Sequence, residues 1–461
     1  MFSKETYVNR RNVLKKSIES GILLFLGNDE LGMNYADNTY HFRQDSTFLY
    51  YFGSDYAGLD AIIDIDEDRE IIFGDELTID HIVWMGTQPT IKSKSERVGI
   101  SETMSKAKLG AYLTEAMWKG RKIHFLPPYR ADHKVKLHDL INRIHARQNE
   151  HVSLEFVKAV VKQRSYKSVE EIEQIDHAAS ITADMHIAAM KMARAGMSEA
   201  EVAAAVQQIA IASGGQLSFP TIATIHGETL HNHYHGNTLK SGDMLLLDAG
   251  AENGMHYAGD MSSTFPVDGK FTTRQKDIYQ IALNSHNAAV DALKPGVKFK
   301  DIHLLACKTI AEGMKDMGFM KGDMNEAVEM GAHALFFQCG LGHMMGLDVH
   351  DMENLGEQWV GYNGEPKSTM FGLKSLRLAR ELESGFVLTI EPGIYFIPEL
   401  IDMWKSEKKF EQFINYDKVE QYKDFGGCRN EEDFLITPDG KRLLGKPVPK
   451  SIDEVEAMRA N

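Results

Sequence analysis

The stretch MLLLDAGAENGMHYAGDMSSTFPV (residues 244–267) carries the pattern that decides the fold. An apolar run leads into Asp248, a second strand-like run follows Asp260, and Asn253-Gly254 between them is a strong hairpin signal. The stretch therefore predicts two antiparallel strands joined by a tight turn, with one acidic residue on each strand.

The spacing of these two aspartates tests whether they can share one site. Across a two-residue loop, directly opposite residues have numbers that add to an odd value, whereas 248 and 260 add to an even value. A regular two-residue turn would point the two side chains to opposite faces of the sheet. For a shared site we expect a three-residue loop, with Gly254 in the left-handed conformation.

Two further acidic residues lie at the ends of apolar strand patterns. Glu391 follows Phe-Val-Leu-Thr-Ile, and Glu431 precedes Asp433-Phe-Leu-Ile. A single strand-end carboxylate could simply point into solvent, because burying it unpaired costs several kcal/mol. Several such residues, together with His343, favour a shared cation site.

Four carboxylates and one imidazole form a hard ligand set, which suits Mn²⁺, Co²⁺ or Zn²⁺. Two divalent ions would neutralise the four negative charges and could activate a water molecule for hydrolysis. A helical di-iron carboxylate site is excluded, because Glu391-Pro392-Gly393 cannot continue a helix.

The composition is that of a globular chain with two or three domains: 461 residues, 43% of them hydrophobic and 25% charged. The net charge of −15 and the lack of a dense basic tract argue against nucleic acid as a partner. No apolar run is long enough to span a bilayer. Three widely spaced cysteines argue against a disulfide framework, so we expect a reducing cytoplasm.

Local signals predict how the chain is organised. Residues 61–65 and 70–73 read as a strand hairpin, and 122–126 as another strand of an α/β region; a boundary is expected near 160–168. Capping boxes at Ser168-Glu171 and Ser198-Glu201 open two helices. Further helices are expected at 274–293 and 299–317, and strands at 386–390 and 434–437. From Pro447 onward we expect surface chain.

Five segments resemble the proline-specific peptidases of the creatinase ("pita-bread") fold, such as aminopeptidase P and prolidase. These are LLLDAG (245–250), YAGDMSSTFPVDGKF (257–271), GLGHMMGLDVHD (340–351), LTIEPGIYF (388–396) and GGCRNEED (426–433). YVNRRNVL (7–14), FRQDSTFLYYFG (42–53) and VWMG (83–86) resemble the aminopeptidase P N-terminal domain. The resemblance implies an α/β (α+β) chain with a creatinase-like N-terminal α/β domain over residues 1–165 and a pita-bread catalytic domain over 166–461.

The resemblance also implies a role for each site residue. The metal ligands would be Asp248, Asp260, His343, Glu391 and Glu431, with Asp260 and Glu431 bridging both ions. Glu391 would also act as the base, and His231 and His350 would hold the scissile carbonyl and the intermediate. Arg429 matches an arginine beside the last glutamate ligand, and Arg377 matches one near the substrate carboxylate in prolidase-like members.

The chain departs from the family pattern in two places. The two aspartates lie one residue further apart than is usual, which fits an enlarged hairpin loop, and Asn430 replaces a more usual aliphatic residue. Neither change removes a ligand. His233 and His235 are interpreted as residues of the loop or of the substrate rim, and Cys339 and Cys428 as packing residues.

The function that the resemblance implies is that of a Xaa-Pro aminopeptidase with two divalent ions, Mn²⁺ before Co²⁺ or Zn²⁺. It would act on peptides with proline in second position and form a homo-oligomer, a dimer or a tetramer. Residues 372–397 are at least as similar to prolidase, so a Xaa-Pro dipeptidase is the alternative. A non-catalytic binding protein or a creatinase is disfavoured by the complete ligand set.

Overall fold

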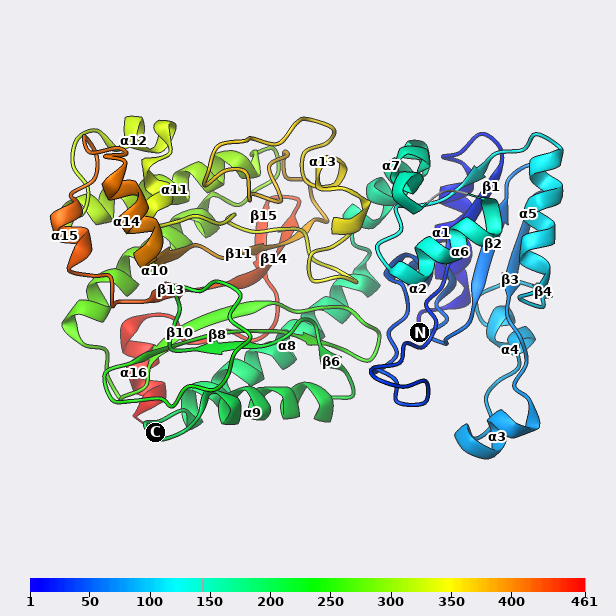
Figure 1. Cartoon of the computed structure of the whole chain (residues 1–461), viewed down its shortest axis with the longest axis horizontal. Coiled ribbons are helices and arrows are strands. Elements are labelled where there is room, and N and C mark those ends of the chain that lie inside the picture. The colour runs from blue at the N-terminus through cyan, green and yellow to red at the C-terminus, as the bar shows by residue number, and fades with distance from the viewer. Residues whose placement is uncertain (143–144, 461) are drawn as a thin grey trace. The chain divides into compact units, whose positions relative to one another are not determined.

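The computed structural model describes residues 1–142 and 145–460, which form two units of mixed strands and helices (Figure 1). The first unit comprises Met1–Arg164 with Met352–Trp359, and the second comprises Ser165–Asp351 with the chain from Val360 onward. No helix within the described ranges is both long and apolar enough to cross a bilayer.

The first unit is built on a five-stranded sheet in the order β4-β3-β2-β1-β5. Its strands are β1 (Ile22–Leu26), β2 (Asp60–Asp64), β3 (Arg69–Phe73), β4 (Glu102–Met104) and β5 (Ile123–His124). The predicted hairpin is confirmed, because β2 and β3 pair antiparallel from Asp60↔Phe73 to Asp64↔Arg69. The helices of this region are α1 (Lys4–Lys15), α2 (Ser46–Phe52), α3 (Ile79–Met85), α4 (Ile91–Glu96), α5 (Lys108–Trp118), α6 (Ala131–Ile141), η1 (His145–His151) and α7 (Leu154–Ser165).

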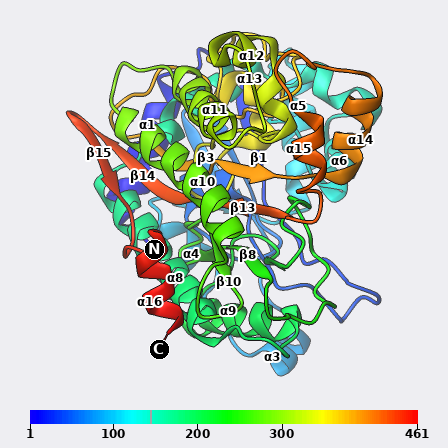
Figure 2. The same ribbon diagram turned by 90° about the vertical axis from the view of Figure 1, so that its left-hand side faces the viewer.

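The second unit places short strands between two helix pairs. The helices are α8 (Val169–Met192) and α9 (Glu199–Ala212) on one side, and α10 (Thr273–Ala292) and α11 (Phe299–Asp316) on the other (Figures 1 and 2). Both predicted capping boxes are formed, since the Ser168 and Ser198 hydroxyls accept from the amides of Glu171 and Glu201. Shorter helices of this unit are α12 (Met324–Met330), η2 (Ala332–Leu335), α14 (Pro398–Ser406), α15 (Tyr416–Glu420) and α16 (Ile452–Arg459). The segment that belongs to the first unit carries η3 (Glu353–Leu355) and most of α13 (Glu357–Val360).

The strands of this unit form two three-stranded sheets, β10-β8-β7 and β11-β14-β15, and two pairs, β12-β13 and β6-β9. Helix α8 packs on β8, β9 and β10, whereas α10 packs on β11, β12 and β13. The strand bounds are β6 (Gln216–Leu217), β7 (Ile222–Thr224), β8 (Met244–Ala249), β9 (Ala251–Glu252), β10 (Met261–Pro266), β11 (Val387–Ile390), β12 (Gly393–Tyr395), β13 (Gly427–Arg429), β14 (Glu432–Thr437) and β15 (Gly440–Leu443).

The hairpin between β8 and β10 has the predicted three-residue loop. Asn253 pairs with Tyr257 through its amide, which donates to the Tyr257 carbonyl at 3.0 Å, so residues 254–256 form the tip. We predicted the left-handed conformation for Gly254, but His256 adopts it instead (φ 65°). The Nδ1 of His256 lies 2.9 Å from Glu252 Oε2, and Asn253 Oδ1 accepts from the Met255 amide at 2.9 Å. These side-chain contacts stabilise a conformation that the backbone alone disfavours for a non-glycine residue.

The chain after Pro447 differs from the surface chain that we expected. Helix α16 begins with a capping box of Ser451 and Glu454 and buries Val455 completely. This end of the chain therefore adds to the core of the second unit.

Candidate metal centre

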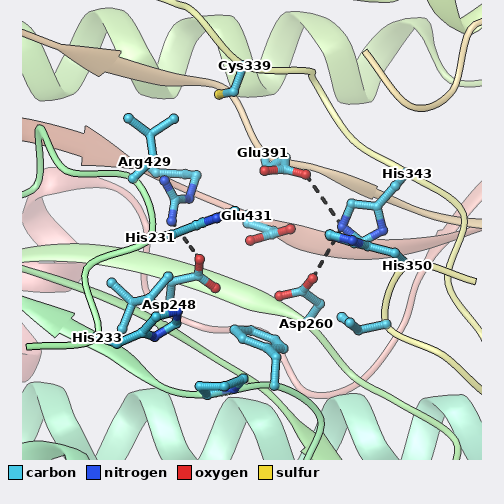
Figure 3. Close-up of a pocket in the computed structure, with 15 residues that line it drawn as sticks. His231, His233, Asp248, Asp260, Cys339, His343, His350, Glu391, Arg429 and Glu431 are labelled. Carbon is cyan, nitrogen blue, oxygen red and sulfur yellow. Dashed lines mark hydrogen bonds and ion pairs between the residues drawn. The ribbon is translucent and has the colours of Figure 1, made fainter. Parts of the chain in front are cut away.

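Eight of the predicted site residues line one cavity of about 230 Å³ in the second unit (Figure 3). They are Asp248, Asp260, His343, Glu391, Glu431, His231, His350 and Arg429. Phe219, Pro220, Ile222, Leu230 and Val349 supply apolar walls. The ninth predicted residue, Arg377, is not part of this lining, so its role stays a prediction.

The acidic residues reach the cavity because each lies at or near a strand end. Asp248 lies in β8, and Asp260 directly precedes β10. Glu391 directly follows β11, and Glu431 directly precedes β14. Backbone pairing brings His343 to β11, since the amide of Thr389 donates to the His343 carbonyl at 3.0 Å.

The polar atoms of these side chains converge on a common point. The Nε2 of His343 lies 3.3 Å from Asp260 Oδ2 and 3.5 Å from Glu391 Oε1 (Figure 3). One ligand atom each from Asp260, His343 and Glu431 lies within 4.8 Å of the other two, and all three residues are buried. The Oδ1 atoms of Asp248 and Asp260 have no hydrogen-bond partner among the described residues. Buried acceptors without donors are the pattern expected where a cation belongs.

The electrostatics of the cluster support the same conclusion. Burial, and then repulsion from Asp260 and other carboxylates, raises the pKa of Glu431 well above its usual range. Burial and the Asp248 charge do the same to the pKa of Asp260. Burial raises the pKa of Glu391 to about 7, although His343 and Arg429 act in the opposite direction. A divalent cation would reverse these shifts, and the oxygen-rich donor set fits hard divalent ions.

Arg429 holds one side of the cavity through three hydrogen bonds. Its Nη2 donates to Asp248 Oδ2 at 2.6 Å, its Nε to Ser262 Oγ at 2.8 Å and its Nη1 to Tyr395 Oη at 2.8 Å. Tyr395 reaches it because β12 and β13 pair with Gly393 opposite Arg429. Burial opposes the charge of the guanidinium, but Tyr395 and the nearby carboxylates raise the pKa of Arg429 above its ordinary value.

Residues two positions from a predicted ligand support the site, and the sequence analysis did not single them out. Ser262, two residues after Asp260, donates from Oγ to Glu431 Oε2 at 2.7 Å. Asp433, two residues after Glu431, accepts the Asp260 amide at 3.1 Å through Oδ2. Side chains two apart on a strand share a face, so this spacing was the available signal.

Thr389 repeats the pattern two residues before Glu391. Its Oγ1 accepts from the His343 amide at 3.2 Å and lies 3.5 Å from Glu391 Oε1. Tyr395 has no such local signal, because its contact with Arg429 depends on the pairing of two strands that are distant in sequence.

Four histidines line the cavity together with the carboxylates: His231, His233, His343 and His350. The rings of His343 and His350 lie 4.3 Å apart in an edge-on arrangement. His231 lines the cavity, where partial burial and the nearby Arg429 charge lower its pKa. His233 also lines the cavity, whereas the Nε2 of His235 lies 3.0 Å from the Thr221 carbonyl oxygen.

Comparison with known proteins agrees with this geometry. Residues 173–438 match metallopeptidase family M24, and residues 7–124 match the N-terminal domain of aminopeptidase P. The chain belongs to metallopeptidase family M24. Membership in M24 confirms a metal-dependent hydrolase and implies divalent ions, which the donor set of the cavity fits.

This M24 peptidase aligns with relatives over nearly its whole length. It is 32% identical to a Xaa-Pro dipeptidase of Homo sapiens, over 96% of this chain and 90% of that protein. It is 30% identical to a probable Xaa-Pro aminopeptidase of Sordaria macrospora, over 95% of this chain and 91% of that protein. The solved structure of Pseudomonas aeruginosa aminopeptidase PepP matches with a TM-score of 0.82 and 26% identity, covering 100% of this chain and 98% of that one. The predicted α/β fold, with an aminopeptidase P N-terminal domain before a pita-bread domain, is therefore confirmed.

Proposed function

We propose that this M24 peptidase is a Xaa-Pro aminopeptidase, which releases the N-terminal residue in front of proline. The observation that carries the proposal is the convergence of Asp260, His343 and Glu431, with unpartnered carboxylate oxygens, inside a cavity of a metallopeptidase. The names of its relatives support the substrate class, since they include Xaa-Pro aminopeptidases and Xaa-Pro dipeptidases.

Five residues would hold two divalent ions: Asp248, Asp260, His343, Glu391 and Glu431. When bound, the ions supply Lewis acidity and a nucleophilic water at neutral pH. We propose Mn²⁺ as the native metal, with Co²⁺ and Zn²⁺ as substitutes, because oxygen donors dominate the set.

Side chains of the cavity would then accept the proton and stabilise the developing negative charge. Glu391, at the edge of the cluster, would accept the proton of the attacking water. His231 and His350 would donate hydrogen bonds to the carbonyl oxygen as negative charge develops on it. Arg429 would act as a positioning residue, because its 2.6 Å bond fixes the orientation of Asp248.

The apolar walls of the cavity suit a proline ring. A peptide bond to proline is a tertiary amide without an N–H, so its recognition depends on shape and apolar contact. Phe219, Pro220 and Val349 line the cavity together with the proposed catalytic histidines and supply such a surface.

The test is an assay of the purified protein with Mn²⁺, before and after chelation, on Ala-Pro and on Ala-Pro-Ala peptides. Metal-dependent release of alanine from the longer peptide would support the proposal, and the Asp260→Asn variant should lose that activity. Cleavage confined to Ala-Pro would make the protein a dipeptidase. Absence of cleavage with metal shown to be bound would overturn the peptidase proposal.

Three finer points belong to the same proposal. We propose that Arg377 lies near the substrate carboxylate, so Arg377→Ala should raise KM while kcat changes little. A homo-oligomer, dimer or tetramer, is proposed from the family resemblance and is tested by light scattering. A reducing cytoplasmic location is supported by the three free thiols, Cys307, Cys339 and Cys428.

A further inference from the structure

A second cluster of metal-binding side chains lies in the second unit, separate from the cavity. Helix α11 contributes His303 and Cys307, and the short helix η2 contributes His333. One ligand atom of each lies within 4.8 Å of the other two, and all three side chains are completely buried. None of the three belongs to the lining of the cavity described above.

The geometry within the cluster suits tetrahedral coordination. His303 and Cys307 are four residues apart on one helix, so their side chains project from the same face. The Sγ of Cys307 lies 3.4 Å from His303 Nε2. Typical Zn–S and Zn–N bonds of about 2.3 and 2.0–2.1 Å at a tetrahedral angle would place the two atoms about 3.5 Å apart.

The remaining ring nitrogens of the cluster lack a well-formed hydrogen bond. The Nδ1 of His303 and both ring nitrogens of His333 lack a hydrogen bond in the part of the chain that the structure describes. The Gly372 backbone contacts His303 and the Val328 backbone contacts His333 as weak hydrogen bonds, but these contacts lie outside ordinary hydrogen-bond geometry. Buried polar groups in folded proteins are nearly always hydrogen-bonded, so three poorly satisfied nitrogens in one cluster point to a missing ligand.

The donor types of the cluster suit zinc. Binding would release the thiol proton of Cys307 to solvent as the metal–sulfur bond forms. A thiolate and two imidazoles are softer than the carboxylate-rich cavity and select Zn²⁺ over Mn²⁺.

We propose that His303, Cys307 and His333 bind one Zn²⁺ ion, with water in the fourth position, at a structural site distinct from the hydrolytic cavity. The ion would join α11 to η2. The chain that follows η2 leads to the cavity. The Phe336 carbonyl, directly after η2, accepts the Tyr395 amide at 2.9 Å, and Cys339 and His343 further along line the cavity. The site would thus fix the segment that carries a predicted ligand of the other centre.

A titration with Co²⁺ tests the proposal independently of peptidase activity. Cobalt bound by a thiolate shows an intense near-ultraviolet charge-transfer band, whereas carboxylate and imidazole ligands do not produce one. We expect the full-length wild-type protein to develop the band, with an intensity that corresponds to one thiolate-bound Co²⁺ per chain, and to lose it when excess Zn²⁺ is added. The Cys307→Ala variant should show no band.

Cys339 provides the matched control, because its thiol lines the hydrolytic cavity. The Cys339→Ala variant should keep the band, whereas loss of the band in this variant would assign the thiolate to the cavity and overturn the proposal. Absence of a band in the wild-type protein would also overturn it, whether or not the variants fold. In that case a neutral His–Cys cluster, hydrated by a buried water, would remain.

Zinc content and thermal stability give a second readout. After dialysis against Mn²⁺ and a trace of Zn²⁺, the wild-type protein should retain one Zn²⁺ per chain and the Cys307→Ser variant none. Zn²⁺ should raise the Tm of the wild-type protein above its value with Mn²⁺ alone, and this increment should be missing in Cys307→Ser. Equal zinc contents in the two proteins would contradict the site.

Discussion

Asp248 lies opposite Ser262 in the β8–β10 pair, so Asp260, two residues from Ser262, projects from the same face of the hairpin as Asp248. Six residue pairs, from Met244↔Pro266 to Ala249↔Met261, fix this register. The strands, and not the three-residue tip, therefore hold the two carboxylates together.

Deletion of Met255 tests this division of roles. Asn253 and Tyr257 would then close a two-residue loop while Asp248 still faces Ser262, so metal content and activity should be close to those of the wild-type protein. A change of one loop residue alters the closure free energy by well under about 1 kcal/mol. Deletion of Met261 is the matched comparison, because it moves Asp260 to the opposite face and should abolish metal binding. Loss of metal in both variants would show that the tip itself positions the aspartates.

Ser262→Ala should weaken the metal centre without removing a ligand. The hydroxyl links Arg429 Nε to Glu431 Oε2, and groups that orient a ligand typically change metal affinity by about 10–100-fold. We expect the Mn²⁺ concentration needed for half-maximal activity to rise by about that factor, with near-normal activity at saturation. The control is Ser263→Ala, since Ser263 contacts His186 on the other face of β10. An equal change in the control would indicate general loosening of the strand.

Arg429→Lys should impair catalysis although the positive charge is kept. A lysine ammonium cannot reach Asp248, Ser262 and Tyr395 in the fixed directions that the guanidinium serves. Loss of one or two charge-assisted bonds, at about 1.5–3 kcal/mol each, predicts a fall in kcat/KM of between about tenfold and about ten-thousand-fold. Tyr395→Phe removes only one of the contacts and should cost less. Steady-state kinetics at saturating Mn²⁺ would compare the two, and the reverse order would contradict this account.

Acid should destabilise the fold through His186 of α8, which is buried against β8 and β10. Its Nε2 lies 3.0 Å from the Ala249 carbonyl, and burial lowers its pKa from 6.5 to about 4. As pH falls from 6.5 towards 4, the unfolded chain takes up a proton that the folded protein excludes, so folding stability is lost across that window. The contribution to the slope is at most about 1.4 kcal/mol per pH unit.

Urea unfolding of metal-free protein at several pH values would measure this effect. His186→Asn should show a shallower decline of the free energy of unfolding than the wild-type protein between pH 6.5 and 4. Identical slopes would mean that His186 does not contribute, whatever the other buried histidines do.

The sequence pattern predicted the parts of the fold that depend on local interactions. The capping boxes at Ser168 and Ser198 and the hairpin over 61–73 were recognised because each signal lies within a few residues. The same capping signature at Ser451-Glu454 was overlooked, although it opens α16. The parity of the residue numbers predicted the three-residue loop correctly. It could not identify His256 as the residue with positive φ, because that conformation depends on the contact of His256 with Glu252.

In the candidate site, too, local patterns were predictable and contacts between distant segments were not. Acidic residues that end apolar strands were visible as a pattern, and the structure brings them to one cavity. The contact of Arg429 with Tyr395 arises from the pairing of β12 with β13, whose register cannot be read from either segment alone. The His303, Cys307 and His333 cluster was missed for the same reason, since η2 folds back on α11 across fifteen residues of intervening chain.

The unpartnered oxygens of Asp248 and Asp260 also bear on how long the protein would survive in a cell. Without cations, buried like charges oppose the closure of the β8–β10 and β11–β14 sheets around the cavity. Ions that bind only the folded chain shift its unfolding equilibrium by mass action. Metal starvation would then enlarge the open population on which proteases act, so the supply of divalent ions would set the abundance of this protein as well as its activity.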